Sequence, residues 1–451
     1  MKRVLLGVLL LVAALLVGAA ATVFALNRRG EAALDGSGPG ALTAVQAAAA
    51  SPDAVARGAY LALAGNCAGC HSARGGAPYA GGTGIETPFG VVYASNLTPD
   101  RQTGIGDWTA AEFWRALHNG RSRDGRLLYP TFPYPNYTQI TRADADAIFA
   151  YLGTLVPVTR PNTAHTLRFP YDTQAALAVW RALYFKPGVE PGAGTGADAK
   201  DAAGSARGAY LVDALGHCNA CHSSRNWLGA TADARDLSGG LIPRQNWYAP
   251  SLLSEREAGV AHWSVDEIVA LLATGRNARA SVQGPMADVV FGSTQHLTPD
   301  DLRAIAIHLQ RLPRAGEPAG RPVGQPAGET ARETIREPDR ATLARGDALY
   351  RTHCSDCHGT DGEGVGRDAY PPLAGNRAVT LPSPANLVHV LLGGGFPPAT
   401  AGNPRPFGMP PFATVLDDGE IAALLTTIRN RWGNRASPVS SSDVRRIRDG
   451  G

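Results

Sequence analysis

The sequence predicts an all-α protein in which three tandem helical domains follow an N-terminal transmembrane helix or signal segment. A similar cysteine-containing segment occurs three times along the 451 residues, which indicates three copies of one ancestral unit. Apolar residues around each copy recur at helical spacing. The chain also has 53 glycines and 33 prolines, which predict long loops between short helices and few extended strands.

Residues 1–30 form a candidate membrane anchor. Two basic residues precede an uncharged run from Val4 to Leu26, which is long enough to cross a bilayer as a helix and longer than the apolar part of a usual signal peptide. We therefore expect a retained anchor, with cleavage near Val23-Phe24-Ala25 as the alternative. The basic N-terminus predicts a cytoplasmic start in the inner membrane and a periplasmic location for the rest of the chain.

Each repeated unit begins with a short amphipathic helix that leads directly into its cysteines. The three segments are ARGAYLALAGNCAGCH, ARGAYLVDALGHCNACH and ARGDALYRTHCSDCH. A second helical pattern closes each unit, and a capping residue marks its start. These closing patterns cover residues 143–155, 299–312 and 418–432.

The same patterns place the domain boundaries. We predict domains at 57–188, 207–312 and 341–434. Linkers rich in glycine, proline and alanine separate them at 191–205 and 313–338. The last residues, 435–451, are rich in serine and arginine and have little to bury, which predicts a disordered tail.

All six cysteines lie in three Cys-x-x-Cys-His motifs. The motifs are Cys67-Ala68-Gly69-Cys70-His71, Cys218-Asn219-Ala220-Cys221-His222 and Cys354-Ser355-Asp356-Cys357-His358. Two thiols three residues apart on a helical turn reach the two vinyl groups of one haem, and the adjacent histidine meets the iron from the proximal side. A redox dithiol, a zinc site and structural disulfides are the other uses of such cysteines. Three histidine-terminated copies with no cysteine left over, on a chain predicted to be exported, favour three covalent haem c groups.

Two methionines are candidate sixth ligands of the haem irons. The chain has three methionines, of which Met1 is the initiator. Met286 follows Gln283-Gly284-Pro285, and Met409 lies in Phe407-Gly408-Met409-Pro410-Pro411. Core packing is the ordinary use of methionine. The position of each one in a loop of glycine and proline, before the last helix of its domain, favours axial ligation, in which a thioether raises the haem potential and closes the iron.

The first domain has no methionine at the corresponding position. Its loop is Leu128-Tyr129-Pro130-Thr131-Phe132-Pro133-Tyr134-Pro135, and the Phe132 side chain cannot bind iron. Haem 1 is therefore five-coordinate, closed by water, or bound by another side chain such as His118 or a nearby tyrosine. His118 lies in a helical pattern, where a polar surface role is the alternative to ligation.

Four further segments accompany the haem motifs: GGTGIETPFG at 81–90, SNLTPD at 95–100, TGIG at 103–106 and PPLAGN at 371–376. With them, the sequence from Arg57 to Asn434 resembles the triheme cytochrome c subunits of membrane-bound bacterial dehydrogenases, the family that includes the cytochrome subunits of alcohol, gluconate and aldehyde dehydrogenases. The resemblance implies that each domain has the small α-helical class I cytochrome c fold. It also implies proximal and distal iron ligands, which are His71, His222 and His358, and Met286 and Met409, respectively.

The resemblance further implies partners. Electrons in that family pass from a catalytic dehydrogenase subunit through the haems to ubiquinone or a terminal oxidase. The alcohol and gluconate members have methionine where this chain has Phe132. The version with phenylalanine is similar to relatives associated with molybdenum-containing aldehyde or heteroaromatic-ring dehydrogenases, which is the partner class that we expect.

The leading functional prediction is an electron-transfer subunit that does not itself transform a substrate. The sequence contains no Gly-rich dinucleotide fingerprint, nucleophile elbow or His-Glu-x-x-His zinc motif. A formal charge of +3 without a basic stripe gives no support for nucleic-acid binding. The alternatives are a haem enzyme or a gas- or peroxide-binding protein that uses an open haem 1, and a soluble shuttle cytochrome released by signal cleavage.

Overall fold

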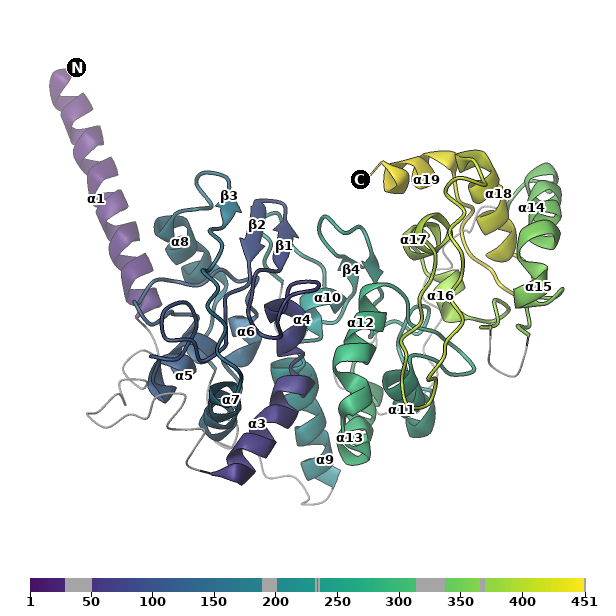
Figure 1. The fold of residues 1–451 in the computed structure, drawn as a ribbon. Coiled ribbons are helices and arrows are strands. Elements are labelled where there is room, and N and C mark those ends of the chain that lie inside the picture. Colours follow the sequence, from purple (N-terminus) through teal and green to yellow (C-terminus); the bar gives the residue numbers. More distant parts are fainter. Residues whose placement is uncertain are drawn as a thin grey trace. The chain divides into compact units, whose positions relative to one another are not determined.

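The computed structural model describes residues 1–28, 51–188, 201–231, 233, 236–313, 337–365 and 370–449. Short helices joined by long loops make up most of it (Figure 1). The chain divides into two compact units. The first consists of Met1–Ala62, Cys70–Thr195 and Trp227–Ala230, and the second of Leu63–Gly69, Gly196–Asn226 and Thr231–Gly451. Most of the first repeat therefore lies in the first unit, and most of the other two repeats lie in the second.

Helix α1 (Lys2–Asn27) is a continuous helix of 26 residues. Among the described residues it is the one helix long and apolar enough to cross a membrane, and a signal sequence near the N-terminus has the same properties. Its last residue, Asn27, is buried. The Asn27 side-chain amide donates to the Ala178 carbonyl at 2.8 Å, and its Oδ1 accepts from Nε of Arg181 at 3.0 Å. Both partners lie on α8 (Gln174–Tyr184), so the end of α1 packs against a helix of its own unit.

The first repeat combines helices with one small antiparallel sheet. Its helices are α3 (Pro52–Ala64), α4 (Cys67–His71), α5 (Ala110–Asn119), α6 (Tyr134–Tyr137), α7 (Arg142–Gly153) and α8. The sheet has the strand order β1 (Gly84–Thr87), β2 (Gly90–Tyr93) and β3 (Thr166–Leu167), so the predicted all-α class omits it. Gly90 has a φ of +130°, and a Cβ there would lie 2.1 Å from the Thr166 carbonyl oxygen. Only glycine permits this tight turn beside β3.

The second repeat has a similar order of helices. It consists of α9 (Asp201–Ala209), the π-helix η2 (Tyr210–Leu215), α10 (Asn219–His222), α11 (Val265–Thr274), α12 (Pro285–Gly292), the 3-10 helix η3 (Thr294–His296) and α13 (Pro299–Gln310). Two short strands pair before α11, β4 (Gly240–Leu241) and β5 (Tyr248–Ala249). The predicted linker at 191–205 lies outside the described residues up to 200 and is helical from Asp201 onwards.

The helices of the third repeat pack around an apolar cluster. The repeat consists of α14 (Arg340–His353), α15 (Ser355–His358), α16 (Arg377–Thr380), α17 (Ala385–Gly393), α18 (Asp418–Ile428) and α19 (Ser441–Arg448). Val388, Ile421 and Leu424 are fully buried in this cluster. The predicted linker at 313–338 lies outside the described residues except at its ends.

A glycine marks the crossing of the first helix and the closing helix in each repeat, the closing helices being α7 (Arg142–Gly153), α13 (Pro299–Gln310) and α18 (Asp418–Ile428). A Cβ on Gly58 would lie 1.8 Å from the Ala147 carbonyl oxygen, and one on Gly208 would lie 2.1 Å from that of Ala304. In the third repeat, a Cβ on Gly346 would lie 2.0 Å from Oγ1 of Thr427. Any side chain would push the two helices apart, so the glycine of the repeated Arg-Gly dipeptide is required by close backbone approach.

The arginine of the same dipeptide forms an equivalent ion pair in each repeat. Arg57 pairs with Asp144, Arg207 with Asp301 at 2.7 Å, and Arg345 with Glu420 at 3.3 Å. Each acidic partner lies in the first turn of the closing helix, three residues after the N-cap. The predicted closing helices are thereby confirmed as α7, α13 and α18, and each ends a few residues earlier than predicted.

The C-terminal tail is ordered over the described residues 435–449, in contrast to the prediction of disorder for 435–451. Helix α19 begins with a capping box between Ser440 and Asp443. Val444 is fully buried against the third repeat, and Nε of Arg448 donates to Oδ1 of Asp418 at 2.7 Å. The prediction was wrong because one apolar face and two ion pairs to Asp418 are enough to dock a short helix onto a core that already exists.

Candidate functional site

A histidine ends the short helix that carries each cysteine motif, namely α4, α10 or α15. Its Nδ1 lies close to a backbone carbonyl oxygen in all three repeats. The distances are 2.7 Å from His71 to Ser95, 2.7 Å from His222 to Pro250, and 3.0 Å from His358 to Pro371. Because a carbonyl oxygen only accepts, Nδ1 must carry the proton, and the lone pair lies on Nε2. Each ring is therefore oriented and protonated as a metal ligand requires.

Burial also favours the neutral form of these rings. It lowers the pKa of His71, His222 and His358, and the hydrogen bond to the carbonyl opposes this shift only in part. Neutral imidazole is the form that binds a metal ion. The lowered pKa values and the hydrogen bonds from Nδ1 therefore both favour a neutral ring with its lone pair on Nε2.

No two of the six cysteines form a disulfide with each other. Burial raises the pKa of Cys218 and of Cys354 to about 12. A redox dithiol needs a lowered thiol pKa, so the surroundings of these two cysteines, in the second and third motifs, disfavour the redox alternative there. No group of three His, Cys, Asp or Glu side chains that could hold a metal ion occurs among the described residues. In each motif, two cysteines beside an imidazole whose lone pair lies on Nε2 fit a covalently attached haem.

Met286 and Met409 lie in different backbone settings. Met286 is the second residue of α12 and packs against Val282, Ala287 and Val290, so its predicted loop position is wrong. Pro285 explains the difference, because proline favours the first turn of a helix. Met409 lies in an extended segment. Its backbone N–H donates to the Gly395 carbonyl at 2.7 Å, and its side chain packs against the apolar cluster of the third repeat. Axial ligation by the two thioethers stays a prediction.

The first repeat presents aromatic side chains at the corresponding place. Phe132 is half-buried, and its ring lies edge-on to Tyr137, with the centroids 5.4 Å apart. His118 lies on α5 with 7% of its surface exposed, so the predicted surface role is wrong. Its ring packs on Trp114 at 4.8 Å, and Nδ1 lies 3.0 Å from Oδ1 of Asn119. Ligation of an iron by His118 stays a prediction.

Two protein-family models each match one segment of this chain, and known proteins match nearly the whole of it. A family model described as "Cytochrome c" matches residues 55–156, and one described as "Cytochrome C oxidase, cbb3-type, subunit III" matches 341–426. The cytochrome c subunit of a quinone alcohol dehydrogenase from Gluconacetobacter polyoxogenes is 38% identical over 91% of this chain and 88% of its own length.

The chain belongs to the family of dehydrogenase cytochrome c subunits.

Two other relatives are subunits of dehydrogenases that are not alcohol dehydrogenases. The gluconate 2-dehydrogenase cytochrome c subunit of Pantoea cypripedii is 36% identical over 87% of this chain and 89% of its own length. A nicotinate dehydrogenase subunit of Pseudomonas putida is 38% identical over 83% of this chain, which corresponds to 30% of that protein. Membership in this family implies covalent haem c and electron transfer beside a catalytic dehydrogenase subunit. It does not favour the alternative of a haem enzyme or gas-binding protein.

The carbonyl acceptors of the three histidines were not found from the sequence. A weak signal exists, because a leucine follows each acceptor two residues later. The three segments are Ser95-Asn96-Leu97, Pro250-Ser251-Leu252 and Pro371-Pro372-Leu373. Two of them lie in the segments that carried the family resemblance, but nothing in their letters indicates a hydrogen bond to a ring nitrogen.

Proposed function

We propose that this chain carries three haem c groups in three tandem domains and passes electrons from a periplasmic dehydrogenase to ubiquinone or a terminal oxidase. One observation supports the number three most strongly: the hydrogen bond from a motif histidine to a backbone carbonyl occurs in all three repeats. The Arg-Gly contact between the first helix and the closing helix also occurs three times. The proposed domains are 57–188, 207–312 and 341–434.

The proposed attachment residues are the cysteines and histidines of the three motifs. They are Cys67, Cys70 and His71; Cys218, Cys221 and His222; and Cys354, Cys357 and His358. Bound haem supplies a one-electron redox centre whose potential depends on its axial ligands. The chain's own residues fix the imidazole tautomer, and Met286 and Met409 would close two of the irons. His118 is the candidate to close the first.

The proposed partner is a dehydrogenase of the molybdenum type that oxidises an aldehyde or a heteroaromatic ring. Two observations support this choice over a quinoprotein or flavoprotein. Phe132 stands where alcohol and gluconate members of the family have methionine. One relative is a subunit of nicotinate dehydrogenase, and nicotinate is a heteroaromatic acid. Helix α1 would anchor the chain in the inner membrane with the repeats on its periplasmic face.

Haem content tests the proposal directly. Purified protein should contain three covalent haems per chain by intact mass and by haem absorbance against protein concentration. Replacing both cysteines of one motif by alanine should remove one haem and leave the other two. A smaller number of haems in the wild type, or zinc bound in place of iron, would contradict the proposal.

A further inference from the structure

The first repeat contains a surface pocket that the proposed haem ligands do not line. The pocket is open, has a volume of about 450 Å³, and includes Gly104, Trp108, Glu112 and Arg123 in its lining. Trp108 is partly exposed there. The second repeat contains the same set of groups in the same local structure, which allows a direct comparison of the two places.

The turn before the tryptophan is equivalent in the two repeats. Gly104 precedes Trp108 by four positions, as Gly259 precedes Trp263. The Trp108 N–H donates to the Ile105 carbonyl at 3.0 Å, and the Trp263 N–H donates to the carbonyl three residues before it, also at 3.0 Å. Each tryptophan thus ends the same kind of turn, directly before a helix.

The helix after the tryptophan is equivalent as well. A capping box begins α5 with Glu112 and α11 with Glu267. In both, Oε2 of the glutamate accepts from the N-cap N–H at 2.8 Å. Oε1 of each glutamate faces an arginine, at 3.6 Å for Arg123 and 2.7 Å for Arg279. The two repeats therefore present a glycine, an indole ring and a Glu–Arg pair in the same order.

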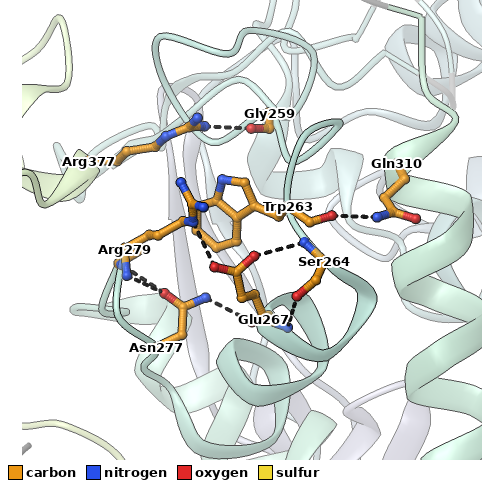
Figure 2. A network of polar contacts seen from close by, with 9 residues as sticks. Gly259, Trp263, Ser264, Glu267, Asn277, Arg279, Gln310 and Arg377 are labelled. Carbon is orange, nitrogen blue, oxygen red and sulfur yellow. Dashed lines mark hydrogen bonds and ion pairs between the residues drawn. The ribbon is translucent and has the colours of Figure 1, made fainter. Parts of the chain in front are cut away.

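In the second repeat an arginine covers this surface. Figure 2 shows Arg377, from the start of α16 in the third repeat, beside Trp263 and Arg279. Its guanidinium donates to the Gly259 carbonyl and lies 5.3 Å from the Trp263 ring centroid, and its backbone N–H donates to the Arg279 carbonyl at 3.2 Å. Trp263 is only 4% exposed. A cation over an indole face is a favourable contact, and more so when water is excluded.

We propose that the pocket of the first repeat binds an arginine side chain of the catalytic dehydrogenase subunit, as the second repeat binds Arg377. The identity of this partner rests on the proposed function. The guanidinium would donate to the Gly104 carbonyl and lie over the Trp108 ring. The pocket also contains Asp124 and Arg126, which pair with each other at 3.2 Å, so the positive and negative side chains of its lining balance. The indole ring of Trp108 and the Gly104 carbonyl, and not a net negative charge, would therefore favour a guanidinium.

Binding of the separated catalytic subunit to the full-length haem-loaded protein tests this proposal. By biolayer interferometry, Trp108→Ala should weaken the Kd roughly tenfold, which corresponds to about 1.4 kcal/mol. Trp108→Phe keeps an aromatic face and should retain most of the affinity. Trp227→Ala removes a tryptophan that is 79% exposed and outside the pocket lining, and it should bind as the wild type does.

A photo-cross-linker in place of Gln102, which lines the pocket, identifies the occupant. The cross-linker should join the pocket to a segment of the catalytic subunit that contains arginine. Replacement of that arginine by lysine should weaken binding. Unchanged affinity in Trp108→Ala, an equal loss in Trp227→Ala, or cross-links to an arginine-free segment or to a second copy of this chain would overturn the proposal. Haem content of each variant is measured separately, so that failure of the haem sites is distinguished from failure of the pocket.

Discussion

The acceptor of each motif histidine is a neutral backbone carbonyl, belonging to Ser95, Pro250 or Pro371. A carboxylate in that place would pull the Nδ1 proton more strongly and make the imidazole a more basic ligand. A carbonyl fixes the ring with less transfer of charge. Because the acceptor is similar in all three repeats, differences in haem potential should arise mainly from the distal side, where the repeats differ most.

Replacing Met286 or Met409 by alanine should lower the potential of one haem each and open that iron to carbon monoxide. Redox titration and carbon monoxide difference spectra measure the two effects. Leucine is the matched control, because it keeps most of the packing volume without a thioether. If the leucine variants keep the wild-type potential and stay closed, the role of these methionines is packing.

Carbon monoxide should bind to one haem in three in the reduced wild-type protein if nothing in the first repeat closes haem 1. Phe132→Met should then create a third His/Met centre and abolish that binding. No binding in the wild type, together with binding in His118→Ala, would instead identify His118 as the ligand. Titration against total haem separates these results.

All three repeats share the same helix crossing at the Arg-Gly dipeptide. In α9, a Cβ on Gly208 would meet the Ala304 carbonyl of α13, whereas a Cβ on Gly204 would meet nothing within 4 Å. The two glycines lie one helical turn apart on the same helix. They therefore form a matched pair for testing the crossing.

Gly208→Ala should lower the free energy of unfolding by about 1–3 kcal/mol, because overpacking forces the helices apart. Gly204→Ala should leave it unchanged or raise it by up to about 1 kcal/mol, because alanine favours helix. Denaturant unfolding of the haem-loaded protein measures both. Equal effects of the two substitutions would contradict the role assigned to the crossing.

Sequence patterns predicted the helices best where a cap and an apolar face coincide. Thr141 and Thr298 begin α7 and α13 as predicted, because each hydroxyl accepts from a first-turn N–H. The sheet around Gly90 was missed because its strands are short and its third strand, β3, lies far from the β1–β2 hairpin in sequence. Helix α19 was missed because its stability comes from docking, which composition does not reveal.

The candidate site was predictable to a similar degree. The cysteines and histidines stand out in the sequence by their spacing, because covalent attachment of haem requires residues close together in the chain, and their role in attachment stays a prediction. The carbonyl acceptors and the pocket at Trp108 depend on how loops fold back, and no local pattern encodes that. Three repeats were visible in the sequence, whereas the chain divides into two compact units, and the proposed domain boundaries stay a prediction.

For the whole molecule, α1 should remain on the mature protein. Asn27 is buried and bonded to Ala178 and Arg181, so removal of the segment before it would take away the helix that positions this side chain. Intact mass of protein extracted from membranes should include the first residues of the chain. A mature N-terminus after Ala25, with the protein released into the soluble fraction, would contradict the retained anchor.

The contact between Asn27 and α8 has a geometric consequence if α1 crosses a membrane. A helix advances about 1.5 Å and turns about 100° with each residue. With the end of α1 fixed to α8, each residue inserted into α1 would raise the first unit by that distance and rotate it by that angle relative to the bilayer. The length of α1 would then determine both the distance of the first unit from the lipid surface and its rotation about the helix axis.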